Sequence, residues 1–153
     1  MDIKEALITA IKQNRGDIIY DHFMFQTLEV KLNALIHLIR VLKEDEQGNH
    51  FINIMIQLIA KPEYLNTVVD TLTPLQEAVI QDKLSFFNFL LMNGASLEKR
   101  NKQGLSGYDL ILKIGNDRFL DFIIQYENVL TEVYKSRSCL LYTSDAADDV
   151  AGV

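Results

Sequence analysis

One repeat distance constrains this chain more than any other feature of its sequence. A Thr-Pro-Leu string at residues 73–75 opens one helix-like run, and Ser-Gly-Tyr at 106–108 opens another 33 residues later. Each run leads into a second apolar stretch, 86–91 and then 119–124, again offset by 33. Self-similarity at a fixed period of this size indicates stacked repeats, which usually provide a binding surface and not a catalytic cavity.

Physical chemistry supports the marked positions of the first unit. The hydroxyl of Thr73 can cap a helix by accepting a hydrogen bond from a free amide of the first turn. Pro74 suits the first helical position, where a missing N–H costs nothing, and the small Ala78 lets a neighbouring helix approach. Gly94 suits a left-handed residue at a helix end, and Gly104 suits a tight turn that needs a positive φ.

Three strings of this unit resemble a known repeat. Residues 72–78 (Leu-Thr-Pro-Leu-Gln-Glu-Ala) are similar to the opening of an ankyrin repeat, and residues 90–97 (Leu-Leu-Met-Asn-Gly-Ala-Ser-Leu) are similar to its close. Residues 101–106 resemble the turn that leads into the next repeat. The resemblance is clearest over residues 72–126, and it implies an all-α ankyrin-type stack of helical hairpins, a solenoid.

The N-terminal half diverges from this pattern. Residues 7–15 parallel residues 75–83 in register, but residues 28–60 read as two helices longer than the family norm, with a turn at 44–49 between them. Pro62 marks a break after the second. The predicted helix pairs are 2–13 with 17–25, 28–43 with 49–60, 74–81 with 85–92, and 107–114 with 118–126, and a further helix is expected to start within 127–136.

Composition and charge narrow the possible partners. The chain has 153 residues and a net charge of −6, and no basic stripe is obvious, so nucleic acid is a poor candidate partner. It has no run of 18 or more apolar residues and no evident secretion signal, so we expect no membrane span. The single cysteine, Cys139, excludes an internal disulfide. We expect a cytoplasmic protein, or one in a host cytosol if it is a secreted effector.

The end of the chain does not continue the pattern. Read back into codons, residues 139–149 resemble the mosaic end and adapter of transposon-based sequencing libraries, translated in one frame. A natural polar tail is the alternative. We therefore expect residues 1–137 to form an ankyrin-like repeat domain that is truncated at its C-terminus, and residues 138–153 to be a non-native tail.

Catalytic and metal-binding signatures are weak. His22, His37 and His50 are spaced so that no two share a helix face, and no cysteine pair accompanies them as in a zinc site. The Gly-x-x-Gly string at 104–107 is better explained as a repeat turn than as a nucleic-acid clamp. No nucleotide-binding glycine motif occurs. We expect no catalysis, no cofactor and no metal.

The leading hypothesis is a protein–protein interaction module that binds a partner through its repeat turns and inner helices. The cationic turn around Lys99, Arg100 and Lys102 would suit an acidic patch on a partner. The alternatives are a non-catalytic N-terminal region of a larger enzyme or effector whose catalytic domain is missing, and a purely structural helical bundle. The predicted binding residues are Lys99, Arg100, Lys102 and Gln103 on the turn, with Gln76, Glu77, Asp109 and Lys113 as solvent-facing residues on inner helices.

Overall fold

The computed structural model describes residues 2–128, and this part of the chain is all-α, as the sequence predicts. Its helices are α1 (Ile3–Gln13), α2 (Gly16–Phe23), α3 (Leu28–Val41), α4 (Glu46–Ile59), the 3₁₀ helix η1 (Pro62–Asn66), α5 (Pro74–Ile80), α6 (Leu84–Met92) and α7 (Gly107–Ile114). Residues 117–128 are also helical. The described residues contain no strand, and Val69 and Leu72 form an isolated antiparallel bridge.

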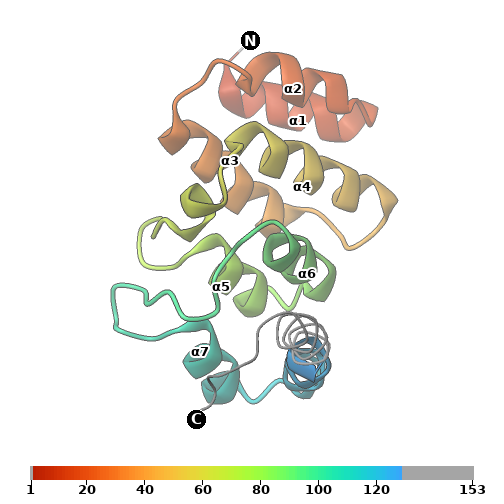
Figure 1. The fold of residues 1–153 in the computed structure, drawn as a ribbon. Coiled ribbons are helices and arrows are strands. Elements are labelled where there is room, and N and C mark those ends of the chain that lie inside the picture. Colours follow the sequence, from red (N-terminus) through yellow and green to blue (C-terminus); the bar gives the residue numbers. More distant parts are fainter. Residues whose placement is uncertain (1, 129–153) are drawn as a thin grey trace, which may run out of the picture. The chain divides into compact units, whose positions relative to one another are not determined.

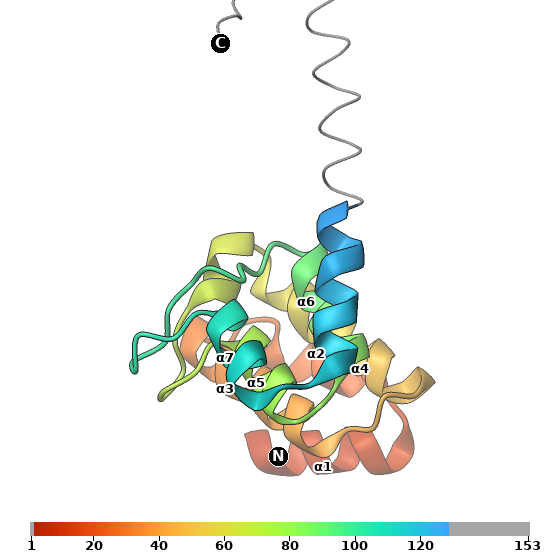
Figure 2. The same cartoon turned by 90° about the horizontal axis from the view of Figure 1, so that it is seen from below.

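The chain divides into two compact units after Ile114. In the first unit, helices that follow one another form the pairs α1–α2, α3–α4 and α5–α6, and successive pairs pack against each other (Figure 1). Figure 2 shows α3, α5 and α7 together on one side and α2, α4 and α6 together on the other. The described part of the second unit is the helix at 117–128 and the residues that lead into it.

The 33-residue period is visible in the hydrogen bonds that begin two helices. At α5, Gln76 N donates to Thr73 Oγ1 over 3.3 Å, and Thr73 N donates to Gln76 Oε1 over 3.3 Å. At α7, Asp109 N donates to Ser106 Oγ over 3.1 Å, and Ser106 N donates to Asp109 Oδ2 over 3.0 Å. Each pair is a reciprocal cap that satisfies two otherwise free backbone donors. The predicted cap at Thr73 is confirmed.

The parallel between residues 7–15 and 75–83 also holds in the backbone. Asn14, with φ of 52°, ends the first helix of its pair, and Asp82, with φ of 56°, ends the first helix of the α5–α6 pair. After each of these left-handed residues the next amide donates to a fully buried alanine 5 positions back, Arg15 N to Ala10 O and Lys83 N to Ala78 O, both over 2.9 Å. Asn and Asp tolerate this conformation better than most residues. The two hairpins therefore turn in the same way.

The predicted turn at 44–49 is wrong at its C-terminal side. Helix α4 begins at Glu46, because the Asp45 side chain accepts a hydrogen bond from Gly48 N over 2.8 Å and caps the first turn. The expected break at Pro62 is confirmed, and Pro62 begins η1. A further helix is expected to start within 127–136. Residues 127 and 128 belong to the helix at 117–128. Residues 129–136, Cys139 and the tail at 138–153 lie outside the described residues.

Apolar stripes along the helices form the core of the first unit. Both stripes of the long pair are buried: Leu32, Leu35, Ile36 and Ile39 on α3, and Phe51, Ile52, Met55, Ile56 and Ile59 on α4. On α6, Phe86 and Phe87 are fully buried, whereas Phe89 is half-buried.

Neighbouring pairs also satisfy each other's helix ends. Gln47 Nε2 donates to Ile11 O over 2.8 Å at the end of α1, and Lys83 Nζ donates to Ile39 O over 2.8 Å near the end of α3. The carboxylate of Glu44 accepts from Ser85 N in the first turn of α6. A cation near a helix C-terminus and an anion near an N-terminus both complement the helix dipole. These contacts tie each pair to the next.

Candidate partner-binding surface

Two loops project on the same side of the first unit. One comprises residues 67–72, between η1 and α5, and the other comprises residues 98–105, between α6 and α7 (Figure 1). We call the second loop the finger. Lys102 N donates to Thr71 O over 3.3 Å, so the two loops are in contact. They form the edge of a surface that continues onto α3.

Two amide side chains hold the finger from inside. Asn101, which is only 7% exposed, accepts at Oδ1 from Gln103 N over 2.8 Å and from Leu105 N over 3.1 Å. Gln76 reaches the finger from α5, and its Nε2 donates to Lys99 O over 3.3 Å and to Leu105 O over 3.0 Å. The backbone of the finger is therefore positioned by part-buried hydrogen bonds before any partner arrives.

The prediction that Gln76 and Glu77 face solvent is wrong. Gln76 is 0% exposed and Glu77 is 4% exposed. Gln76 is buried because it caps α5 and holds the finger. Glu77 is buried because it receives hydrogen bonds from Arg40 of α3, Nε over 3.1 Å and Nη2 over 3.2 Å, and from Gln81 Nε2 over 2.9 Å. The hydrogen bond to Glu77 raises the pKa of Arg40 above its usual value.

The charged side chains of the finger point outward. Lys99, Arg100 and Lys102 are exposed. Arg100 Nη1 donates to Gly104 O over 2.6 Å and to Asp109 Oδ2 over 3.3 Å, so this guanidinium folds back onto its own loop and onto α7. Lys99 and Lys102 are the two finger cations best placed to meet a partner.

The other predicted binding residues fall into two groups. Gln103 on the finger and Lys113 on α7 are exposed, as predicted. Asp109 is half-buried and engaged as a helix cap. The Ser106 amide, together with the Ser106 hydroxyl and Arg100, lowers the pKa of the Asp109 carboxyl below its usual value. Asp109 therefore organises the base of the finger.

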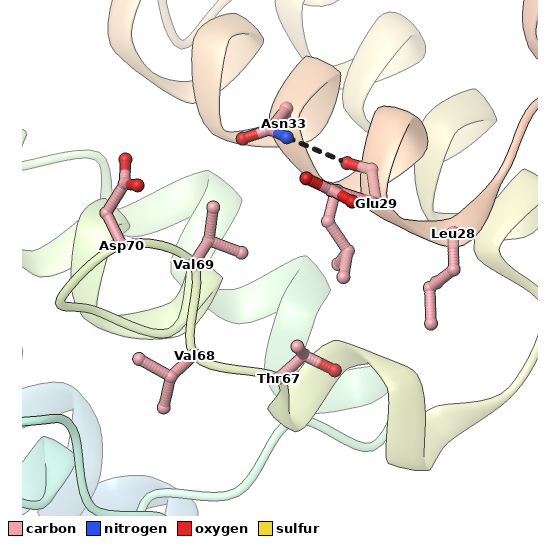
Figure 3. A pocket seen from close by; sticks show the side chains of 8 residues that line it. Leu28, Glu29, Asn33, Thr67, Val68, Val69 and Asp70 are labelled. Atoms are coloured by element: carbon pink, nitrogen blue, oxygen red, sulfur yellow. Dashed lines mark hydrogen bonds between the residues drawn. The ribbon is translucent and has the colours of Figure 1, made fainter.

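A groove that the sequence did not predict lies between α3 and the loop at 67–72 (Figure 3). Its volume is about 300 Å³. It is lined by Leu28, Glu29, Leu32 and Asn33 of α3 and by Thr67, Val68, Val69 and Asp70 of the loop. One signal could have indicated it. A shift of the finger by one period of 33 residues gives 65–72, which predicts a second projecting loop in that part of the chain.

The histidines are not gathered into a site. His37 and His50 are exposed, on α3 and α4, and His22 is half-buried on α2. Within residues 2–128 no group of three or more His, Cys, Asp or Glu side chains is arranged to hold a metal ion. Over the same range, no helix combines the length and the apolar character needed to cross a bilayer.

Comparison with known proteins adds no relative. No protein-family model matches the chain, and no curated protein or solved structure matches it either.

Proposed function

We propose that this protein is a non-catalytic protein-binding module of the ankyrin-repeat type, and that its finger contacts an acidic patch on a partner protein. The observation that carries the proposal is that the finger has a fixed backbone and exposed cationic side chains. Its backbone is held from below by Gln76 and Asn101, while Lys99 and Lys102 are exposed above. The reciprocal caps at Thr73 and Ser106, one period apart, support the repeat assignment.

A positioned loop suits binding for an energetic reason. Ordering a flexible loop on binding reduces affinity, because the conformational entropy is lost at that moment. Here the hydrogen bonds of Asn101 and Gln76 order the finger when the protein folds. The partner then meets a loop whose shape is already set, and its binding free energy is not spent on ordering it.

The exposed lysines would contribute mainly to encounter and selectivity. Charges at the rim of an interface raise the association rate and exclude partners of like charge more than they raise affinity. The whole chain carries a net charge of −6, so a local cationic finger on an acidic protein gives an acidic partner a defined place to bind.

Peptide selection tests this proposal without a known partner. The full chain is immobilised, and a random peptide library displayed on phage is selected against it at low ionic strength. We expect enrichment of peptides rich in Asp and Glu, with affinities that fall as salt is added. The Lys99→Glu/Lys102→Glu variant should bind these peptides at least about tenfold more weakly.

A charge-matched control separates the finger from net charge. The Lys12→Glu/Lys43→Glu variant makes the same change in net charge at two exposed lysines outside the finger. It should retain most of the affinity. Equal loss in both double variants, or no enrichment of acidic peptides, would refute the proposal.

A further inference from the structure

The groove between α3 and the loop at 67–72 has a floor and a rim of different chemistry. Leu32 is buried at 3% exposure and Val69 is half-buried, so these two side chains form an apolar patch within a lining that is otherwise mixed in polarity. Glu29 and Asp70 are both exposed and belong to opposite walls. In Figure 3, Glu29 and Asn33 on α3 lie across the groove from Val69 and Asp70 on the loop.

We propose that this groove receives the side chain of an arginine from the partner protein. The inference deepens the proposed function and rests on it, since it assigns a second contact to the same partner. The aliphatic part of the arginine would pack on Leu32 and Val69, and its guanidinium would reach the carboxylates of Glu29 and Asp70. Long cationic side chains bind in this way, with an apolar stem and a charged head.

Charge complementarity selects a cation for the groove. Neither a lysine nor an arginine is among the residues that line it, whereas two carboxylates are. One nearby cation competes for Asp70. Arg40 donates two hydrogen bonds to Glu77, and the charge of Asp70 further favours its protonated form. Because Arg40 already offsets part of the Asp70 charge, Glu29 should supply the larger share of the attraction.

The polar groups favour arginine over lysine. A guanidinium is planar and carries five N–H donors, so it can bond several acceptors at once, whereas an ammonium acts as a compact point charge. Asn33 Nδ2 donates to Glu29 O over 3.0 Å, and the remaining Oδ1 is an acceptor beside the carboxylates. The three acceptor groups, the two carboxylates and Asn33 Oδ1, match a guanidinium better than an ammonium.

The size of the groove favours a single side chain over a larger ligand. Pockets for drug-sized molecules span about 300–1,000 Å³, and this groove, at about 300 Å³, is at the lower limit. Its position next to the finger matters too, because Lys102 N is bonded to Thr71 O. A partner segment that places an arginine in the groove and acidic residues near it would satisfy both surfaces.

A single-residue probe tests the inference. The ¹⁵N-labelled full chain is titrated with the Nα-acetylated amide of arginine, and amide chemical shifts are followed by NMR. We expect saturable shifts at residues 28–33 and 67–70, with weaker binding of the corresponding lysine compound. The corresponding citrulline compound has the same shape without the charge and should bind about tenfold more weakly or worse, since hydrogen bonds between charged groups are the stronger ones.

Two variants assign the contacts. Glu29→Gln should weaken arginine-amide binding more than Asp70→Asn, because Arg40 already offsets part of the Asp70 charge. Asp70 has φ of 59°, a conformation that asparagine tolerates, so Asp70→Asn should not unfold the protein. Glu29→Gln changes one exposed side chain and should also leave the fold intact. Asp21→Asn is the matched control, because it makes the same change of charge at an exposed carboxylate of α2 outside the groove, and it should bind arginine amide as the unaltered protein does.

The outcomes separate this inference from the proposed function. Equal binding of the citrulline and arginine compounds, or unchanged binding by Glu29→Gln, would overturn the inference. If acidic peptides still depended on Lys99 and Lys102 in that case, the proposed function would stand alone. If arginine amide bound as expected and acidic peptides did not bind at all, the acidic-partner function would fall and the groove would remain.

Discussion

Among single residues, Gln76 joins α5 to the finger through three hydrogen bonds of one amide side chain. Its side chain caps α5 through Thr73 N and holds the finger through Lys99 O and Leu105 O. A buried polar group that loses its partner incurs a desolvation cost of about 1–3 kcal/mol. Removal of this amide would leave Lys99 O without the donor that it has now, whereas Leu105 O would keep its bond from Asn101 N over 2.9 Å.

The Gln76→Ala variant should therefore lose about 2 kcal/mol of the free energy of unfolding, with added loss of helix capping. Urea denaturation followed by circular dichroism measures the change. Gln103→Ala is the matched control, because Gln103 is exposed on the same finger and uses its backbone N–H for its bond to Asn101. It should change stability by no more than about 0.5 kcal/mol. Equal stability of the two variants would show that the internal amide does not support the finger.

Asp109 gives the base of the finger a dependence on pH. Its folded-state pKa lies below the usual value of 3.8, first because the Ser106 amide donates to the carboxylate. A carboxyl group with a lowered pKa stabilises the fold above its unfolded pKa, and this stabilisation disappears as pH falls through the folded value. Asp109→Asn keeps an acceptor for the cap but cannot ionise.

The deficit in unfolding free energy of Asp109→Asn relative to the unaltered protein should therefore be present at about pH 7 and shrink at about pH 2.5. Urea denaturation at both pH values provides the measurement. A deficit of the same size at both pH values would mean that the ionised form has no special role in the cap.

The burial of Glu77 illustrates a limit of sequence reasoning at this scale. The sequence predicted the roles of Thr73 and Ala78 correctly, because these roles depend on neighbours along the chain. The burial of Glu77 depends on Arg40, 37 residues earlier, and no local pattern encodes such a pairing. The exposed finger residues were predictable, since a polar turn between apolar helices has little else to face.

At the scale of helices, close packing against backbone fixes the position of the first turn of α4. Gly48 lies in the first turn of α4, and a Cβ atom built there would meet Lys43 O at 1.9 Å and Phe86 Cζ at 3.1 Å. The carbonyl is backbone and cannot rotate away, so the α3–α4 connection and the α6 phenylalanine both require a glycine here.

Gly48→Ala tests whether packing outweighs helix propensity at this position. Propensity alone would stabilise a helix by up to about 1 kcal/mol on replacing glycine by alanine. Overpacking against backbone typically costs about 1–3 kcal/mol, so we expect a net loss of about 1–2 kcal/mol, measured by thermal or urea unfolding. Gln57→Ala, at an exposed site of the same helix, should be neutral or slightly stabilising. A Gly48→Ala protein more stable than the parent would contradict this packing.

Across the whole first unit, the sequence predicted the number and order of the helix pairs better than their boundaries. The order of the helix pairs follows from apolar periodicity and from helix-ending residues such as Pro62 and Gly94, because both signals depend only on nearby residues in the sequence. Boundaries and the groove depend on which helices meet, as in the packing of Gly48 on the preceding loop and of Glu77 on α3. The groove at α3 also required knowing where the loop at 67–72 projects.

Deletion of one full period is the sharpest test of a repeat stack. Removal of residues 73–105 places Ser106 where Thr73 now stands, so the reciprocal cap of Ser106 and Asp109 would open the helix that follows Leu72. Leu110, which is 6% exposed, would take the position of Glu77. In a stack, stability is approximately the sum of unit terms and nearest-neighbour interfaces.

The shortened chain should therefore fold with one unit's share less stability and a smaller denaturant slope, because less surface is exposed on unfolding. Urea titration followed by circular dichroism measures both quantities. Removal of residues 73–108 is the out-of-register control, since it also deletes the Ser106 cap and the start of α7, and it should be markedly less stable. A bundle without repeats should lose its cooperative transition in both deletions, and that result would contradict the stack on which the binding proposal depends.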